Sequence, residues 1–395
     1  MRSKLVQIPL LLALITLTGC GEAAQPEVEA LRVGVIAPFS GDFEALGRAV
    51  RDGTSLAAEV WNQGDGVLGR PVQLVLEDSE CDYQQARAAA QALVAQDVLF
   101  VIGAVCADAS EGVAQIASGA DVLQISPASV DLDLTLDAEG ELRPLVFRVP
   151  FTDVDQGVVA AKYALERMGA EEAAILHAEN SAYGGALAEA FQRTFEAGGG
   201  EVSTVQTYEL GVEVYFEELE KIRDAEPDVI YAPGYYTEIN VAIEQARQFG
   251  MFQPVLGSDG WHAAGLDLDV VDGCYFTTHF FADEGRFAVR SWNELFETRY
   301  LVPPNALATL SYDAANVLFA AMVEAKAFDP YIVARAMESM SFDTIAGWME
   351  FDENHNPIKA VPMLAVEDGR VTLIGHFFAQ ELGQEPGEGA TGGEE

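Results

Sequence analysis

The residues best suited to chemistry are small, aromatic and acidic side chains in four loops, each directly after a predicted strand. Small residues at a helix start expose backbone N–H groups, which suits a ligand carboxylate. Tyrosine rings and one aspartate suit a cation. Each loop alone is also ordinary turn chemistry, but their joint placement favours binding of a small molecule. The four loops are Ser126-Pro127-Ala128-Ser129, Tyr183-Gly184-Gly185, Gly234-Tyr235-Tyr236 and Gly257-Ser258-Asp259-Gly260.

Catalytic motifs, by contrast, are missing from the sequence. The chain has five histidines, and no two of them stand at a metal-ligand spacing such as i, i+4. There is no G-x-S-x-G elbow, Walker loop or G-x-G-x-x-G motif. In a chain this acidic, most carboxylates are expected to be solvated surface groups. We therefore expect a protein that is not an enzyme and that uses neither a metal nor a cofactor.

The elements that must position these loops alternate between short apolar runs and stretches of helical periodicity. This alternation is typical of βαβ units and of a parallel sheet. A first series is complete by about Pro150, and a second series of similar size follows it. Predicted strands cover residues 31–37, 72–76, 98–103, 122–125, 145–149, 173–176, 202–207, 229–232 and 255–256. Predicted helices cover residues 45–62, 83–95, 110–117, 155–168, 186–197, 215–224 and 238–249.

The rhythm changes after Gly273, where a strand is followed by helices predicted near residues 287–300, 308–325 and 330–340. Consecutive helices without an intervening strand suit a chain that returns to pack on the first domain. Two doubly wound domains side by side enclose a cleft, and such sheets bind ligands outside the carboxyl ends of their strands. The predicted fold class is α/β, with two doubly wound parallel-sheet lobes.

The N-terminus has the layout of a secretory signal: a basic head, an apolar run and small residues before a cut. Its end, Leu17-Thr18-Gly19-Cys20, resembles the lipobox of bacterial lipoproteins, in which the cysteine is lipidated. A plain signal peptide with an incidental cysteine is the alternative. We expect a signal peptide at 1–19, a lipidated tether at 20–30 and a disordered acidic tail at 381–395. No other stretch approaches the length of a membrane helix.

The charge balance is strongly acidic, with 63 Asp and Glu against 22 Lys and Arg and a formal net charge of −41. A chain of this charge repels polyphosphate, which argues against nucleic acid as a partner.

Three cysteines remain when Cys20 is set aside, so the chain can form at most one disulfide and leaves one odd thiol. Export makes a disulfide possible. The pair Cys81 and Cys106 is favoured, because each lies at the end of a predicted neighbouring strand. Cys274, inside an apolar run, is expected to be a buried small hydrophobe.

With these motifs in order, the chain resembles the substrate-binding proteins of branched-chain amino acid ABC transporters, the Leu/Ile/Val-binding family with the type I periplasmic-binding fold. The resemblance covers residues 31–377. Its motifs are VGVIAPFSG, EDSECD, VIGAVC, ISPAS, VDQG, YGG, APGYY and LGSDG, in register.

The resemblance implies two lobes that close on a ligand through three crossovers, near Pro150, Thr278–His279 and Lys359. Lobe 1 would comprise residues 31–150 plus 279–359, and lobe 2 residues 151–278 plus 360–380. It supports the Cys81–Cys106 disulfide. It also implies a carboxylate-binding wall at Cys106–Ala107 and Ala128–Val130, including Ser129. Opposite that wall the ligand would meet Asp259, Tyr183 and Tyr235.

Several positions depart from the family pattern. Ala107 replaces the serine that binds the ligand carboxylate, and Val130 replaces a threonine, so two hydroxyl donors are lost; an unmet partner there costs about 1–3 kcal/mol. Ser129 or backbone N–H groups are possible substitutes. Leu46 stands where leucine binders tend to have tyrosine, and Asp259 is one methylene shorter than the usual glutamate.

The function expected from this reading is binding of an amino acid, or a related small amide or amine, by a monomeric lipoprotein facing the periplasm or the cell exterior. It would deliver the ligand to an ABC permease of the inner membrane. The leading alternative is a ligand-sensing receptor or regulatory subunit with the same lobes, and an enzyme on this architecture is a third possibility.

Overall fold

The computed structural model describes residues 28–380 of the 395-residue chain. The predicted signal peptide at 1–19, the lipidation site Cys20, most of the tether and the tail at 381–395 lie outside the described residues.

The first lobe is built on a five-stranded parallel sheet in the order β2-β1-β3-β4-β5. The inner strands β1, β3 and β4 are almost wholly buried, because helices cover both faces of the sheet, and their sequences are correspondingly apolar. The strands are β1 (Leu31–Ala37), β2 (Val72–Asp78), β3 (Phe100–Gly103), β4 (Leu123–Ser126) and β5 (Val146–Arg148).

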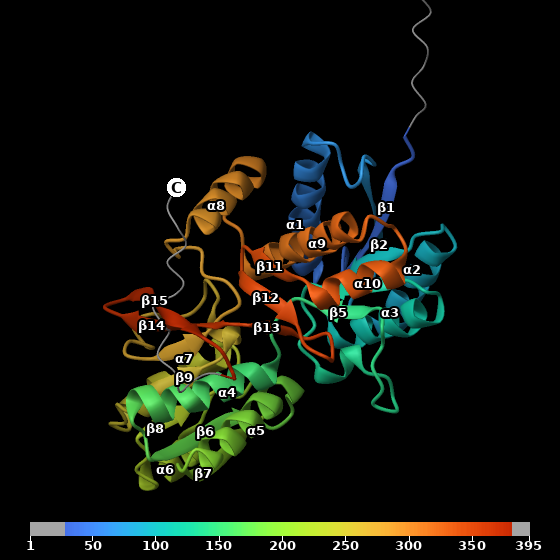
Figure 1. Ribbon diagram of the computed structural model, residues 1–395. Helices are drawn as coiled ribbons and strands as arrows, with labels where there is room; N and C mark the ends of the chain where they lie inside the picture. Colours follow the sequence, from blue (N-terminus) through green and yellow to red (C-terminus); the bar gives the residue numbers. More distant parts are fainter. Residues whose placement is uncertain (1–27, 381–395) are drawn as a thin grey trace, which may run out of the picture.

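Helices pack on the two faces of this first sheet in separate hydrophobic clusters. One cluster joins the sheet to α1 (Glu44–Gln63), α9 (Ala306–Ala325) and α10 (Pro330–Ser339). The other joins it to α2 (Tyr83–Val94) and α3 (Ala107–Gly119). The blue and orange helices of Figure 1 therefore belong to one lobe although they lie some 250 residues apart.

Helix α9 corrects one expectation from the sequence. With 20 residues, this helix is long and apolar enough to cross a membrane, judged by length and composition alone. The sequence had predicted no segment of that length beyond the N-terminal apolar run. In the fold, 67% of its most apolar window is buried. Its neighbours are α1, α10 and the first sheet, so its hydrophobicity is accounted for by its place in the core.

The second lobe contains a seven-stranded sheet in the order β15-β14-β10-β9-β8-β6-β7. Strands β6 to β10 run parallel, and β14 and β15 add an antiparallel pair at one edge. The strands are β6 (Glu172–Ala178), β7 (Glu201–Tyr208), β8 (Val229–Tyr231), β9 (Val255–Gly257), β10 (Tyr275–Thr277), β14 (Val361–Glu367) and β15 (Arg370–Phe377).

Four helices cover the second sheet, two on each face. Helices α4 (Asp153–Tyr163) and α5 (Ala182–Ala197) share one hydrophobic cluster with the sheet. Helices α6 (Phe216–Asp224) and α7 (Tyr236–Gln248) share another. Helix α4 ends in a π turn, Ala164–Met168, before Gly169 adopts a left-handed conformation.

The last third of the chain carries strands that the sequence did not predict. β11 (Ser341–Thr344), β12 (Gly347–Phe351) and β13 (Pro357–Lys359) form a small antiparallel sheet beside α10. Helix α8 (Phe287–Tyr300) packs its buried tryptophan and phenylalanine residues against α1 and the start of α9.

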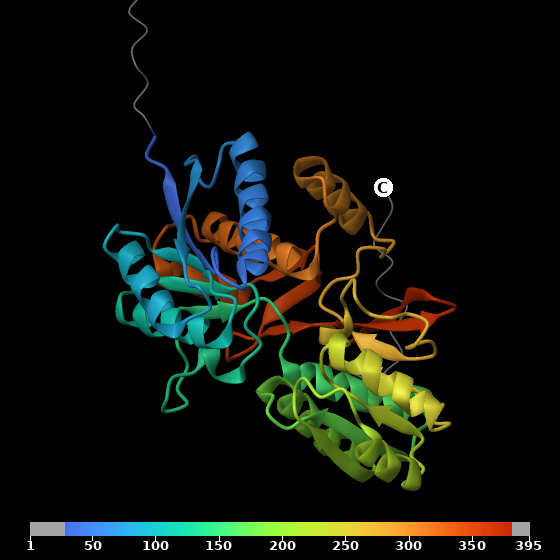
Figure 2. The same cartoon turned by 180° about the vertical axis from the view of Figure 1, so that it is seen from behind.

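Three chain segments connect the lobes. The first lobe lies at the upper right of Figure 1 and the upper left of Figure 2, and the second lobe lies diagonally below it. They join β5 to α4, β10 to α8, and β13 to β14. The segments touch one another: the Phe151 ring stacks on His279 at 3.9 Å between centroids, and Lys359 Nζ donates to the Val149 carbonyl at 3.5 Å. The prediction of two doubly wound lobes joined by three crossovers is confirmed.

The predicted disulfide is also confirmed. Cys81, after β2, is bonded to Cys106, directly before α3, with the two Cα atoms 5.4 Å apart. The bond holds the start of α3 against the loop after β2, although β1 lies between β2 and β3 in the sheet. Cys274 is a buried free thiol, and burial raises its pKa to about 11.

Candidate ligand-binding site between the lobes

A cavity of about 390 Å³ lies between the lobes, at the carboxyl ends of the parallel strands. Its lining includes five of the eight predicted ligand-binding residues: Ala107, Ala128, Ser129, Val130 and Tyr183. Val105, Asp131, Asp133, Asp153, Val154, Ala182 and Ala186 complete the lining. The volume falls within the range of small-molecule sites.

The first-lobe wall is shaped by Ser126, the last residue of β4. Its hydroxyl donates to the Ala104 carbonyl at 3.2 Å and accepts from the backbone N–H of Ser129 at 3.0 Å. These bonds tie the loop after β4 to the loop after β3. As a result, Ala128 and Ser129 are presented beside Ala107, the first residue of α3.

Side-chain hydrogen-bond donors are scarce on this first-lobe wall. Ala107 and Val130 have no polar side-chain atom, as the sequence indicated. Ser129 is only 3% exposed, and its hydroxyl has no hydrogen-bond partner among the described residues. Helix α3 has no side-chain cap at Cys106, so backbone N–H groups of its first turn are further donors.

Asp153 comes from the second lobe and was not predicted. A capping box between Thr152 and Asp155 fixes the start of α4 and therefore the place of Asp153 on its first turn. The side chain is 7% exposed, and its Oδ1 has no hydrogen-bond partner among the described residues. Burial, together with the charges of Asp259 and Asp131, raises the pKa of Asp153 to about 8.

Arg148 lies behind the first-lobe wall at the end of β5 and is fully buried. It donates to the Ser129 carbonyl at 3.4 Å. Burial lowers its pKa to about 10, although nearby aspartates, Asp131 first among them, favour its charged form. The guanidinium is therefore charged at neutral pH.

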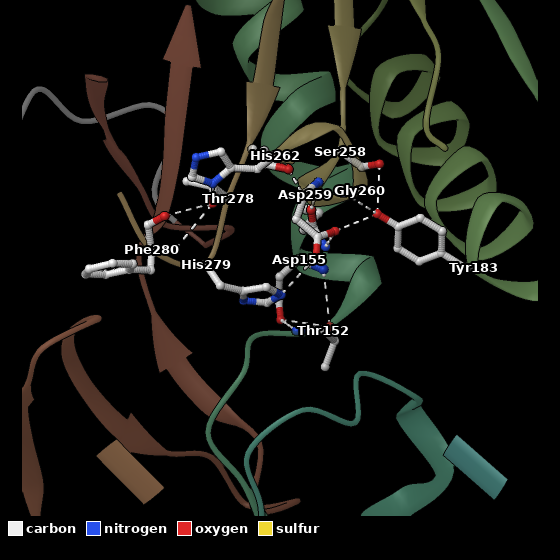
Figure 3. A network of polar contacts seen from close by, with 12 residues as sticks. Thr152, Asp155, Tyr183, Ser258, Asp259, Gly260, His262, Thr278, His279 and Phe280 are labelled. Carbon is white, nitrogen blue, oxygen red and sulfur yellow. Dashed lines mark hydrogen bonds and ion pairs between the residues drawn. The ribbon is translucent and has the colours of Figure 1, made fainter. Parts of the chain in front are cut away.

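Tyr183 dominates the second-lobe wall. Its hydroxyl donates to Asp259 Oδ1 at 2.5 Å and accepts from the backbone N–H of Gly260 at 3.1 Å (Figure 3). Ser258 Oγ lies 2.9 Å from the same hydroxyl. Burial and the Asp259 charge raise the pKa of Tyr183 well above its ordinary value, so it remains a donor. Its ring stacks on Tyr235 at 5.3 Å.

Gly260 allows this close approach. A Cβ atom at this position would lie 2.5 Å from the Gly234 carbonyl oxygen and 3.2 Å from the Tyr183 hydroxyl. Any side chain here would force the loop after β9 away from the loop after β8. The glycine in the sequence Gly257-Ser258-Asp259-Gly260 is therefore needed for packing.

Asp259 is held by side chains from three parts of the second lobe and its connections. Tyr183 and Gln156 Nε2, the latter at 3.0 Å, donate to Oδ1, and His279 Nε2 lies 3.4 Å from Oδ2. Burial alone would raise the pKa of this carboxyl. The bonds from His279, Tyr183 and Gln156 outweigh burial and lower the pKa to about 2. Asp259 is thus charged, and each of its oxygens has a partner.

Gln156 extends the network in two directions. Its Oε1 accepts from the backbone N–H of Asp259 at 3.1 Å and from the Thr277 hydroxyl at 2.6 Å. It therefore connects α4 with the end of β10, next to the second crossover. Gln156 and His279 were not predicted as site residues, although Gln156 belongs to the VDQG motif and His279 lies at a predicted crossover.

Asp259 does not line the first cavity but a second one, of about 490 Å³, on the far side of this network. His262, His279 and Thr278 form its polar end, and His262 Nδ1 lies 2.7 Å from the Thr278 hydroxyl. The rest of its lining is largely apolar and includes Pro303 and Pro304 before α9.

Two predicted residues line neither cavity. Leu46, in the first turn of α1, is 37% exposed. Tyr235 is 46% exposed and reaches the site only through its stacking on Tyr183.

Comparison with known proteins identifies similar chains. The family model described as "Periplasmic binding protein" matches residues 30–370. A leucine-, isoleucine-, valine-, threonine- and alanine-binding protein from Pseudomonas aeruginosa is 26% identical over 336 residues, 82% of this chain and 86% of that protein. A Leu/Ile/Val-binding protein homologue from Brucella melitensis is 29% identical over 331 residues, 82% of this chain and 87% of that protein.

A solved structure supports the same relationship. A leucine-binding protein from Thermotoga maritima is 31% identical to this chain, with a TM-score of 0.73, covering 88% of this chain and 99% of that one.

Proposed function

Because this chain belongs to the periplasmic binding protein family, as a substrate-binding protein of the branched-chain amino acid ABC transporter type, we propose that its ligand is an amino acid or a related small amide or amine, held between the lobes. Proteins of this family are extracytoplasmic and bind solutes without converting them. The observation that carries the proposal is the cavity lined from both lobes, in which Ser129 Oγ and Asp153 Oδ1 are buried without partners.

The proposed contacts come from both walls. Ala107, Ala128, Ser129 and Val130 form the first-lobe side, and Tyr183 faces them. Asp259 and Tyr235 act behind Tyr183, the first through its hydrogen bond and the second through ring stacking. Leu46 would join the site only when the lobes close. The relatives' names, which specify leucine and other small amino acids, support a ligand of this size.

Closure would move two bodies, residues 31–150 plus 279–359 and residues 151–278 plus 360–380, about the three crossovers. The contacts that link the crossovers, Phe151 on His279 and Lys359 on Val149, favour a hinge in which few residues absorb the motion. We also propose a lipid anchor at Cys20 and a monomer. A tether at 20–30 would keep the binder close to an ABC permease of the inner membrane and raise its local concentration there.

A thermal-shift screen followed by calorimetry tests this function. Amino acids, their amides and their amines are added to the mature chain, and a ligand that binds only the folded state must raise the melting temperature. We expect stabilisation by at least one compound, and loss of its binding in Asp259→Ala. If no compound of these classes raises the melting temperature, the proposed ligand class is wrong. Unchanged affinity in Asp259→Ala would remove Asp259 from the site.

A further inference from the structure

The cavity between the lobes has an acidic lining. Asp131 and Asp133 approach it from the first lobe and Asp153 from the second, and among the described residues no lysine or arginine lines it. Arg148 offsets part of this charge from behind the first-lobe wall. An adjoining smaller cavity, of about 130 Å³, adds Asp108 to Asp131 and Asp133, and its Glu111 is already paired with Arg143 at 2.5 Å. A cation is therefore favoured here by charge.

Two buried polar atoms in this lining have no hydrogen-bond partner among the described residues. They are Asp153 Oδ1 and Ser129 Oγ, which belong to side chains that are 7% and 3% exposed. Native proteins leave few such atoms unsatisfied, because each costs free energy. A carboxyl oxygen and a hydroxyl can both accept from an N–H group. A ligand with a hydrogen-bond donor would therefore satisfy both atoms at once.

Asp259 does not fill this role in the structure. Its Oδ1 accepts from Tyr183 and Gln156, and its Oδ2 pairs with His279. Adding a ligand ammonium group would mean displacing at least one of these partners. Asp153 has no such competition at Oδ1. Of the two second-lobe aspartates, Asp153 and not Asp259 is therefore free to meet a cation.

For a ligand carboxylate, in contrast, the cavity offers few hydrogen-bond donors. Ala107 and Val130 supply no hydroxyl, which leaves Ser129 and the first N–H groups of α3 as donors near it. Asp108, in the first turn of α3, and Asp131 would lie beside that carboxylate and repel it.

We propose that the cavity selects a primary amine, a small organic cation that has no free carboxylate. Its ammonium group would lie between Asp153 of the second lobe and the first-lobe residues Ser129 and Asp131. This inference rests on the proposed function and narrows its ligand class. The binding step is non-covalent, and the hydrophobic part of the amine would contact Val105, Val154 and the Tyr183 ring.

Matched compounds test the selection directly. L-leucine and L-phenylalanine are compared with their decarboxylated amines, 3-methylbutylamine and phenethylamine, and with their deaminated acids, by calorimetry on the mature chain. We expect an amine to bind at least ~10-fold more tightly than its amino acid, equivalent to about 1.4 kcal/mol, and the acid not to bind. A preference for the amino acid or the acid overturns the inference and leaves the proposed function standing.

If no amine of either series binds, the inference is overturned. The proposed function fails with it only if no amino acid, amide or amine of the thermal-shift screen raises the melting temperature, so the two failures are distinguishable.

Asp153→Asn tests the residue. It keeps the side-chain shape and should weaken amine binding at least ~10-fold. Asp65→Asn, an exposed aspartate of the first lobe, is the matched control and should change nothing. Equal amine affinity in Asp153→Asn and the parent chain would remove Asp153 from the site. A melting curve of each variant shows that it is folded.

Proton release is a second readout. Asp153 faces Asp131, Asp155, Asp259 and Arg148, and its raised pKa of about 8 keeps it protonated at pH 7. An arriving cation favours the carboxylate, so binding should release a proton. The measured enthalpy of amine binding should then differ between phosphate and Tris buffers in the parent chain, but not in Asp153→Asn. Equal enthalpies in both buffers for the parent chain would contradict the proposed contact.

Discussion

The two walls of the cavity differ in how their polar groups are satisfied. On the second-lobe wall, Asp259 has partners on both carboxylate oxygens, and the Tyr183 hydroxyl both donates and accepts. On the first-lobe wall, Ala107 and Val130 offer no polar side-chain atom, and the Ser129 hydroxyl has no partner among the described residues. The Asp259–Tyr183 part of the second-lobe wall is complete without a ligand, whereas Ser129 of the first lobe and Asp153 of the second are not.

This difference indicates that one set of residues maintains the shape of the cavity and another set determines which ligand it prefers. The network around Asp259 fixes the positions of Tyr183, Gln156 and the second crossover, so it holds the shape of one side of the cavity. The ligand preference would then be determined by groups outside that network, mainly Asp153 and Ser129. Changes to the network should therefore act on stability and, by displacing Tyr183, on the affinity for any ligand, whereas changes at the other groups should act mainly on ligand preference.

The largest effect is expected from Asp259→Ala. The substitution leaves the buried Tyr183 hydroxyl and His279 without their acceptor. The free energy of unfolding should fall by about 3–5 kcal/mol, because Tyr183, Gln156 and His279 each lose an acceptor and each unsatisfied buried group costs about 1–3 kcal/mol. Urea denaturation at pH 7 measures the change, with the exposed Asp272→Ala of the same lobe as control. A fall below about 1 kcal/mol would show that the network does not hold this wall.

Tyr183→Phe breaks the same wall more gently. It removes the bonds to Asp259 and Gly260 but keeps the ring that stacks on Tyr235. We expect the free energy of unfolding to fall by about 1–3 kcal/mol, since the partners stay buried. Tyr235→Phe preserves the same ring pair at a half-exposed site and should change stability by less than about 0.5 kcal/mol. Equal effects of the two variants would contradict the role given to the Tyr183 hydroxyl.

The two buried aspartates should respond to pH in opposite directions. Asp259 has a pKa lowered to about 2, so its stabilisation is present above pH ~4 and is lost as the pH falls through 2. Asp153 has a pKa raised to about 8, so its contribution is full below pH ~4 and is lost as the pH rises through 8.

Asp153→Asn should therefore gain up to about 4 kcal/mol relative to the parent chain between pH 5 and pH 9, because the parent loses about 1.4 kcal/mol per pH unit until the pH reaches the raised pKa of about 8. Urea denaturation at the two pH values checks this. A stability difference that stays constant between them would show that Asp153 is not protonated in the folded protein.

The smallest effect on stability is expected from restoring the hydroxyls that the first-lobe wall lacks. Ala107→Ser combined with Val130→Thr should change the free energy of unfolding by less than about 1 kcal/mol, because neither side chain is fully buried. The ratio of leucine to 3-methylbutylamine affinity should rise about tenfold, since a carboxylate gains two donors. Calorimetry with both compounds measures the ratio, and an unchanged ratio would contradict the explanation from missing hydroxyls.

Much of the fold could be predicted because its inner strands are continuous apolar runs. β1 reads LRVGVIA and β3 reads FVIG, and both are buried on two faces. β11, with the sequence SFDT, and β15, RVTLIGHF, alternate between buried or half-buried and exposed side chains, since they lie at sheet edges. Short alternating segments of this kind carry a weak signal beside strong helices.

The site could be predicted where it follows strand ends and not elsewhere. Ala107, Ser129 and Tyr183 lie in loops that the strand pattern locates, and the structure brings them to one cavity. Asp153 lies on the first turn of a helix after a crossover, in a chain with 63 acidic residues, and nothing local distinguishes it. Its burial beside Asp131 and Asp259 is a tertiary property.

A crystal structure of the mature chain with the tightest compound from the screen tests the central claim most directly. We predict ligand density in the cavity between Ser129 and Tyr183, with a ligand nitrogen within hydrogen-bond distance of Asp153 Oδ1. Density in the second cavity, beside His262 and Pro304, with only water between Ser129 and Tyr183, would contradict the account.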